Sequence, residues 1–186
     1  MNKGRIVYIV DGPDGTGKTS LCKNLSRMFN IPIYHQSYHK DMRLHNMQFE
    51  NALDLLRNSE TGFILDRYVF SDKVYADVYR NSKYIPLFDD CFNALTYANA
   101  NVIFTLPKDR NRYLEFFKKL YESRNEMYNP DKMLEVYDGY NNIFNKKWNF
   151  NINRFDLFDI IDNKDTENKF LEFNWNTEKY EQAKID

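Results

Sequence analysis

Three of the six glycines in this 186-residue chain lie in one short segment, directly before a lysine and a threonine. Residues 12–19, GPDGTGKT, fit the pattern G-x-x-x-x-G-K-[ST]. Glycines at this density allow a tight loop whose backbone N–H groups meet phosphate oxygens without side chains in the way. The pattern therefore predicts a loop that binds the phosphates of a nucleotide.

Each chemical group of this loop has an expected role. Lys18 would reach the β- and γ-phosphates of ATP, and the Thr19 hydroxyl would hold Mg²⁺. The helix expected after the loop would add the positive end of its dipole. The alternative is a plain glycine turn with a solvated lysine. The loop residues expected to bind ATP are Gly12, Pro13, Asp14, Gly15, Thr16, Gly17, Lys18, Thr19 and Ser20.

A second group of reactive residues follows the apolar run at 63–65. Asp66 and Arg67 end this run, and Ser71 and Tyr75 come shortly after. A guanidinium at the carboxyl end of a strand suits a phosphate, because its planar fork of donors matches phosphate oxygens. Asp66 could hold Mg²⁺ through water, act as a general base, or only orient Arg67. The residues themselves leave these three roles open.

These two segments resemble a known family. Asp66-Arg67-Tyr68, Ser71 and Tyr75 are similar to the DRY-x-x-S-x-x-x-Y segment of the thymidylate kinases, whose glycine loop is similar as well. The resemblance follows the order of elements over roughly residues 1–160 but is specific only in the two segments. It implies a nucleoside-monophosphate-kinase fold, ATP with Mg²⁺, and a homodimer. The deoxynucleoside kinases share the loop and a similar Asp-Arg pair, and they remain an alternative.

The resemblance also implies roles for single residues. Asp14 would accept a hydrogen bond from the 3′-hydroxyl of the acceptor sugar, or would only stabilise the loop. Residues at about 118–130 match a mobile lid, in which Arg124 is the only arginine and would cover the transferring phosphoryl group. The alternative for Arg124 is a solvent-facing helix arginine. Arg112, five residues after Pro107, matches an ATP-binding arginine of the family.

The acceptor is expected to lie between these segments and a helix at about residues 44–58. Phe49 could stack on the base, although an aromatic at helical spacing is more often part of a core. No arginine for a thymine carbonyl lies around residues 47–53, so the base preference is left open. The residues expected to bind the acceptor are Asp14, Phe49, Arg67, Tyr68, Ser71 and Tyr75. Those expected to act in catalysis are Lys18, Asp66, Arg67 and Arg124, with Thr19 and Asp66 at the metal.

The reaction expected from these residues is ATP- and Mg²⁺-dependent phosphoryl transfer to a deoxynucleoside monophosphate, with a dTMP-like acceptor. A monophosphate is already an anion, so its kinase needs cations that hold it in line with the donor. A deoxynucleoside kinase is the first alternative, and its neutral 5′-hydroxyl would need a carboxylate base. A nucleotide-binding module without catalysis is the second alternative.

Apolar runs and helical periodicities place these residues in an α/β domain. Five strands that alternate with helices predict a three-layer fold, with a parallel five-stranded sheet covered by helices on both faces. The strands are expected at residues 5–10, 31–34, 63–66, 101–106 and 155–161. The helices are expected at about 18–29, 44–58, 70–81, 86–99, 109–122 and 129–144.

Composition narrows the class of protein. The chain carries 26 basic and 27 acidic residues, a net charge of −1, which argues against a nucleic-acid partner but allows small nucleotides. No apolar run approaches the roughly 20 residues of a membrane span, and the two cysteines lie far apart. We therefore expect one cytoplasmic domain over residues 1–186, without a membrane partner and with a polar tail at about 166–186.

Overall fold

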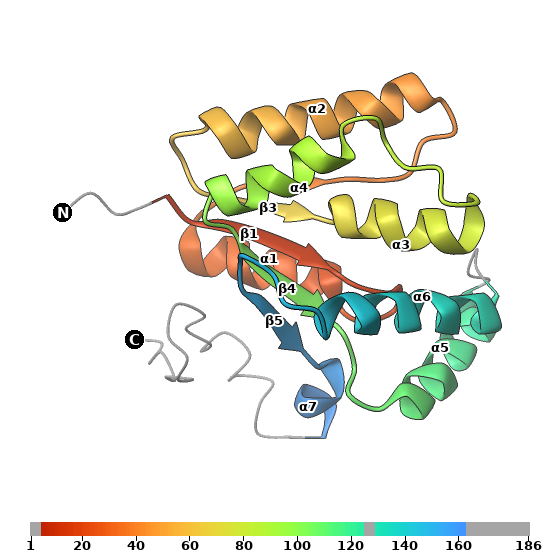
Figure 1. Cartoon of the computed structure of the whole chain (residues 1–186). Coiled ribbons are helices and arrows are strands. Elements are labelled where there is room, and N and C mark those ends of the chain that lie inside the picture. The colour runs from red at the N-terminus through yellow and green to blue at the C-terminus, as the bar shows by residue number, and fades with distance from the viewer. Residues whose placement is uncertain (1–4, 125–128, 163–186) are drawn as a thin grey trace, which may run out of the picture.

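The fold is built around a central β-sheet, and the computed structural model describes residues 5–124 and 129–162 (Figure 1). The strands are β1 (Val7–Asp11), β2 (Ile33–His35), β3 (Phe63–Asp66), β4 (Asn101–Thr105) and β5 (Ile152–Phe155). The helices are α1 (Lys18–Phe29), α2 (Met42–Asn58), α3 (Val69–Tyr79), α4 (Phe88–Tyr97), α5 (Arg110–Arg124), α6 (Pro130–Phe144) and α7 (Leu157–Ile161).

The sheet has the order β2-β3-β1-β4-β5, and every pairing is parallel. After β1 the chain first builds β2 and β3 on one side, and then β4 and β5 on the other. The order therefore reverses at β1, and ligands of open α/β sheets bind at the carboxyl end of the strands beside such a reversal. The glycine loop follows β1 at that point.

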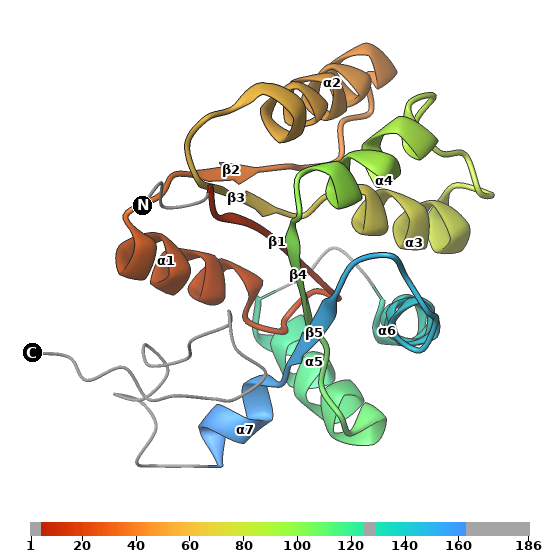
Figure 2. The ribbon, with the colours of Figure 1, turned by 60° about the vertical axis from the view of Figure 1, so that its left-hand side comes forward.

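Helices cover both faces of the sheet, as Figure 2 shows with α1 on one side and α3, α4 and α6 on the other. Along β1, Tyr8 and Val10 belong to the cluster that contains the α1 residues, whereas Val7 and Ile9 belong to the larger cluster beneath α2, α3, α4 and α6. Successive side chains of a strand point to opposite faces. Because β1 is buried on both faces, its sequence is an apolar run from Val7 to Val10 without polar alternation. The predicted fold class is confirmed.

The predicted fifth strand is wrong in position. Residues 155–161 were expected to be extended, but β5 ends at Phe155 and α7 follows. Asp156 starts this helix, because its carboxylate accepts a hydrogen bond from the N–H of Phe158 at 3.0 Å. Its other oxygen accepts from the Lys108 N–H at 2.7 Å and ties the start of α7 to the segment after β4. β5 lies at the edge of the sheet and contains Asn153 and Arg154, so it lacks the apolar run of a central strand.

The remaining elements lie within about two residues of their expected bounds, a normal uncertainty for helix and strand ends. The polar tail predicted at 166–186 lies outside the described residues, so the single-domain expectation stays a prediction. Within the described ranges, none of the helices combines the length and apolar character needed to cross a bilayer.

Candidate functional site

The glycine loop connects β1 to α1, and its backbone needs glycine. Gly12 has φ of 144°, and a Cβ there would lie 2.5 Å from the Thr105 side-chain oxygen. Gly15 has φ of 76°, and its Cβ would lie 2.9 Å from a methyl of Leu120 on α5. Gly17 caps α1 in a left-handed conformation without a side-chain hydrogen bond. The N-cap residue therefore offers no side-chain acceptor to the first N–H groups of α1, an arrangement that suits an anion.

Lys18 lies inside this loop. The Pro13 carbonyl accepts hydrogen bonds from the Lys18 ammonium at 2.5 Å and from the Thr16 hydroxyl at 2.7 Å. The Thr16 hydroxyl also contacts that of Thr105 at 2.6 Å, which ties the loop to β4. Burial lowers the pKa of Lys18 from 10.5 to about 8, and the positive charge of Arg67 acts in the same direction.

Asp14 connects the loop to the end of β3. Its carboxylate accepts a hydrogen bond from the Arg67 guanidinium and lies 3.6 Å from the Lys18 ammonium. Burial by itself would raise the pKa of Asp14, but the charges of Lys18 and Arg67 outweigh it and hold this pKa below its usual value. Arg67 has φ of 73°, a strained left-handed conformation for a residue other than glycine, of the kind that persists at functional sites.

Asp11 is a buried acceptor that the sequence interpretation did not single out. Its carboxylate accepts hydrogen bonds from the N–H groups of Gly12, Tyr68 and Ser71 at 2.9–3.1 Å, and from the Ser71 hydroxyl. The Tyr140 hydroxyl of α6 donates to it at 2.6 Å. Burial raises the pKa of Asp11 more than these hydrogen bonds lower it. Asp11 thus fixes the glycine loop against α3 and α6.

Two oxygen donors near the loop suit a hard cation. Asp66 is 3% exposed, and one carboxylate oxygen contacts the His35 ring at 2.9 Å. Its other oxygen is buried and has no hydrogen-bond partner among the described residues. Thr19 and Ser20 are exposed in the first turn of α1. Mg²⁺ prefers such oxygen ligands and completes its shell with water and phosphate, so Asp66 and Thr19 fit the expected metal.

A cavity of about 550 Å³ opens beside the loop, between α2 and α3. Every residue that the sequence assigned to the acceptor lines it, although the residues come from the loop, from α2 and from the β3–α3 region. The Arg67 guanidinium lies over the Tyr75 ring, 5.7 Å from its centre, at the loop end of the cavity. The six residues are Asp14, Phe49, Arg67, Tyr68, Ser71 and Tyr75.

The other end of this cavity holds a second acid–base pair. The Asp72 carboxylate accepts hydrogen bonds from Arg80 at 2.7 Å, from His45 at 3.0 Å and from the Ile85 N–H at 3.1 Å. Burial raises the pKa of Asp72, but these hydrogen bonds outweigh it and the pKa is lowered. The sequence interpretation missed the pair. The signal in the sequence for this pair was Asp72, an acidic residue on the buried stripe of α3, three residues after Val69.

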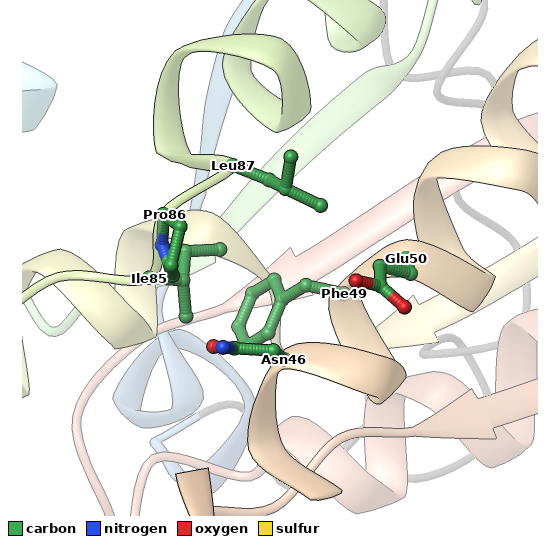
Figure 3. Close-up of a pocket in the computed structure, with 6 residues that line it drawn as sticks. All are labelled: Asn46, Phe49, Glu50, Ile85, Pro86 and Leu87. Carbon is green, nitrogen blue, oxygen red and sulfur yellow. The ribbon is translucent and has the colours of Figure 1, made fainter. Parts of the chain in front are cut away.

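A smaller cavity of about 130 Å³ lies on the other side of Phe49. Figure 3 shows the Phe49 ring between Asn46 of α2 and the segment before α4, with Ile85 and Leu87 facing it. Phe49 lines both cavities and stacks on Tyr68 with ring centres 5.8 Å apart. It is 3% exposed, so it is both a core residue and the wall between the two cavities.

The roles predicted for Arg112 and Arg124 toward ATP and the transferring phosphoryl group are not tested by the described structure. Arg112 donates from both terminal nitrogens to Asp162 at 2.6 Å and lies over the Phe158 ring at 4.1 Å. Arg124 is the last residue of α5, and its side chain lies outside the described part of the structure, as do residues 125–128 of the expected lid. Their roles toward ATP stay predictions.

Comparisons with known proteins bear on the fold. No protein-family model and no curated protein matches the sequence. Among solved structures, the YorR protein from Bacillus subtilis, in complex with phosphorylated GDP, is similar over 87% of this chain and 97% of its own, with a TM-score of 0.59 and 19% identity. Deoxyadenosine kinase from M. mycoides with bound dATP is similar over 86% and 98%, with a TM-score of 0.58 and 15% identity. At these identities the likeness establishes only that this chain shares the fold of these two proteins.

Proposed function

We propose that the protein transfers a phosphoryl group from ATP to a deoxynucleoside monophosphate, with a dTMP-like acceptor. One observation carries this proposal: Lys18 of the glycine loop and Arg67 of the acceptor cavity both contact Asp14. A donor phosphate on the loop and an acceptor in the cavity would therefore meet at one point. Phosphoryl transfer depends mainly on such positioning and on the stabilisation of charge.

The loop would hold the donor. The uncapped N–H groups at the start of α1 and the Lys18 ammonium would bind the phosphates of ATP. Asp66 and Thr19 would hold Mg²⁺, which neutralises charge on the donor phosphates. The buried Asp66 oxygen without a hydrogen-bond partner among the described residues supports this assignment.

The cavity would hold the acceptor. Arg67 would pair bidentately with the acceptor phosphate, and Asp14, once released, would accept a hydrogen bond from the sugar. An oxygen of the acceptor phosphate would then bond to the γ-phosphorus while the bond from that phosphorus to ADP breaks. Arg124 and Arg112 would bind the donor phosphates from α5. A homodimer is proposed on the family resemblance alone.

A deoxynucleoside acceptor is the second candidate, and the Asp14–Arg67 pair favours it in one respect. The charge of Arg67 is balanced by the Asp14 carboxylate, which is about one-fifth exposed. A neutral nucleoside would leave this ion pair intact, whereas a monophosphate must displace Asp14 from it. A further solved structure of deoxyadenosine kinase from M. mycoides, with products dCMP and a flexible dCDP bound, is similar to this chain with a TM-score of 0.52.

A coupled assay of ADP release with Mg²⁺ and ATP separates these candidates. The acceptors are the four common deoxynucleosides and their 5′-monophosphates. Turnover with monophosphates alone supports the proposal, and turnover with nucleosides alone replaces it with the second candidate. Lys18→Ala should abolish turnover, whereas Lys23→Ala, an exposed lysine on the same helix, should not. Silence across the panel, or full activity of Lys18→Ala, contradicts the proposal.

A further inference from the structure

The Asp66 carboxylate at the end of β3 is buried but only half used within the described structure. Asp66 is 3% exposed, and its oxygen Oδ1 has no hydrogen-bond partner among the described residues. A buried polar atom without a partner is costly, so native proteins supply one from water, an ion or a ligand. Oδ1 is therefore available to a ligand, and the group that holds the other oxygen decides its direction.

The other oxygen, Oδ2, is held by His35, the last residue of the neighbouring strand β2. His35 lies opposite Asp66 in the parallel pairing of β2 with β3, and the Gln36 N–H donates to the Asp66 carbonyl at 2.9 Å. The His35 ring lies beside the carboxylate, and its Nδ1 donates to Oδ2 at 2.9 Å. Because the sheet fixes both backbones, this hydrogen bond gives the carboxylate one direction.

Two cations near the glycine loop are within electrostatic range of the same carboxylate. Arg67 directly follows Asp66 in the chain, and burial lowers the pKa of Lys18 while the charge of Asp66 opposes this shift. In the described structure both cations pair with Asp14, and neither forms an ion pair with Asp66. Asp14 therefore serves these two cations, whereas the contact with His35 leaves Asp66 available to a third cation.

We propose that His35 is a positioning residue for the metal, which orients Asp66 so that Oδ1 is presented to the Mg²⁺ of the bound nucleotide. Hydrogen-bonding groups behind a metal ligand fix its orientation, and their loss typically lowers metal affinity 10- to 100-fold. The His35 side chain is 56% exposed, so it contributes little to the core. The assignment rests on the proposed function in one respect, namely that Asp66 holds Mg²⁺ beside the phosphates of ATP.

The test measures nucleotide binding without an acceptor, so that it does not depend on turnover. Calorimetry gives the affinity for the β,γ-imido analogue of ATP in Mg²⁺ and in EDTA, and the ratio of the two is the gain due to the metal. We expect this gain to fall at least about 10-fold in His35→Leu, with the affinity in EDTA unchanged. His39→Leu is the control and should keep the native gain, because His39 does not line the cavity.

Further variants separate the orientation of Asp66 from a general structural role of His35. His35→Asn keeps an N–H donor at this position and should retain more of the gain than His35→Leu. Asp66→Asn should lose the gain by itself, and adding His35→Leu to it should have no further effect, because the positioned ligand is already gone. If His35→Leu fails to fold, His35→Ser replaces it, since a serine hydroxyl is too short to reach the carboxylate.

Each outcome supports or overturns the assignment. A gain that survives in His35→Leu, an equal weakening in Mg²⁺ and in EDTA, or equal losses in His35→Asn and His35→Leu overturns it. A native chain that binds the analogue equally well with and without Mg²⁺ also overturns it, and a native chain that binds no nucleotide overturns the proposed function as well. A loss confined to Mg²⁺ supports the assignment even if no acceptor is phosphorylated, an outcome that contradicts only the proposed function.

Discussion

Two Asp–Arg pairs lie at the two ends of one cavity, and their surroundings differ. Asp14 and Arg67, at the glycine loop, have side chains 20% and 23% exposed. Asp72 and Arg80, at the far end, are 0% and 14% exposed. Asp14 joins two cations to one carboxylate, whereas Asp72 uses both oxygens to hold α2, α3 and the segment before α4.

The Asp–Arg pairs at the two ends of the cavity therefore have different roles. A buried carboxylate must keep its partners, because an unpaired buried charge is strongly destabilising. A pair whose side chains are about one-fifth exposed is partly screened by water and costs less to break than a fully buried one, so its charges can be exchanged for those of a ligand. The comparison predicts that changes at Asp72 act on stability, and that changes at Asp14 and Arg67 act on binding and turnover.

The largest effect is expected for Asp72→Ala, which leaves Arg80 and His45 without their shared acceptor. We expect the free energy of unfolding in urea to fall by about 3–5 kcal/mol, the usual cost of breaking a buried pair. Asp77→Ala on the same helix is the matched control, because Asp77 pairs with Lys73 at the surface, and it should cost under about 1 kcal/mol. Equal losses in the two variants would contradict the comparison.

Arg67→Met should act on turnover instead. We expect kcat/KM for the acceptor to fall about 10²- to 10³-fold, because one preorganised charge at the transferring group is lost. The urea midpoint should stay near that of the native chain, since Arg67 is partly exposed. Arg27→Met, on the exposed face of α1, is the control for losing an arginine. Unchanged turnover in Arg67→Met would remove the arginine from the mechanism.

Asp14→Asn is expected to have a smaller effect than Arg67→Met, and it should strengthen phosphate binding. Asp14 pairs with Lys18 and Arg67, so under the proposed function it would compete with phosphate for these two cations. Removing its charge should tighten the binding of inorganic pyrophosphate by up to about fivefold, the equivalent of a partly exposed ion pair. Turnover should nevertheless fall, because the proposed hydrogen bond from the acceptor sugar to Asp14 would be weakened. Pyrophosphate binding is measured by calorimetry. Weaker binding in the variant would show that Asp14 organises the loop and does not compete with phosphate for the two cations.

The smallest effect concerns pH. Burial lowers the pKa of Lys18 to about 8, so the free protein loses this charge at a pH where an exposed lysine keeps it. Only the protonated lysine attracts phosphate, so pyrophosphate affinity should weaken about twofold between pH 7 and 8. In Lys18→Arg the guanidinium stays protonated, so the part of the pH dependence that comes from this residue should disappear. The same slope in both proteins would assign the titration to another group.

Local patterns in the sequence accounted for most of the fold and for the groups at the loop end. The spacing of residues 12–19 fixed a strand–loop–helix unit, and residues 63–67 placed Asp66 and Arg67 at the end of a strand. The fifth strand was misplaced because the apolar run at 155–161 is interrupted by Asp156, whose side chain begins a helix. Short apolar runs alone do not distinguish strand from helix.

The far end of the cavity could not be predicted in the same way. Asp72 and Arg80 are separated by two helical turns, but His45 lies on another helix and Ile85 in an irregular segment. Asp11 likewise binds α3 and α6 through Ser71 and Tyr140, residues 60 and 129 positions away. Contacts of this kind depend on how distant elements pack.

The sequence by itself determined the glycine loop, the start of the adjacent helix and the Asp66-Arg67 pair. Each of these features is formed by residues that are close together in the chain, so their spacing in the sequence specifies their geometry. Only the tertiary structure decided that Arg67 meets Asp14 across 53 positions and that Arg80 is held by Asp72 and His45. The physical reason is that a buried charge is stable only where folding brings it enough hydrogen-bond partners, and those partners come from elements that are adjacent in space and not in sequence.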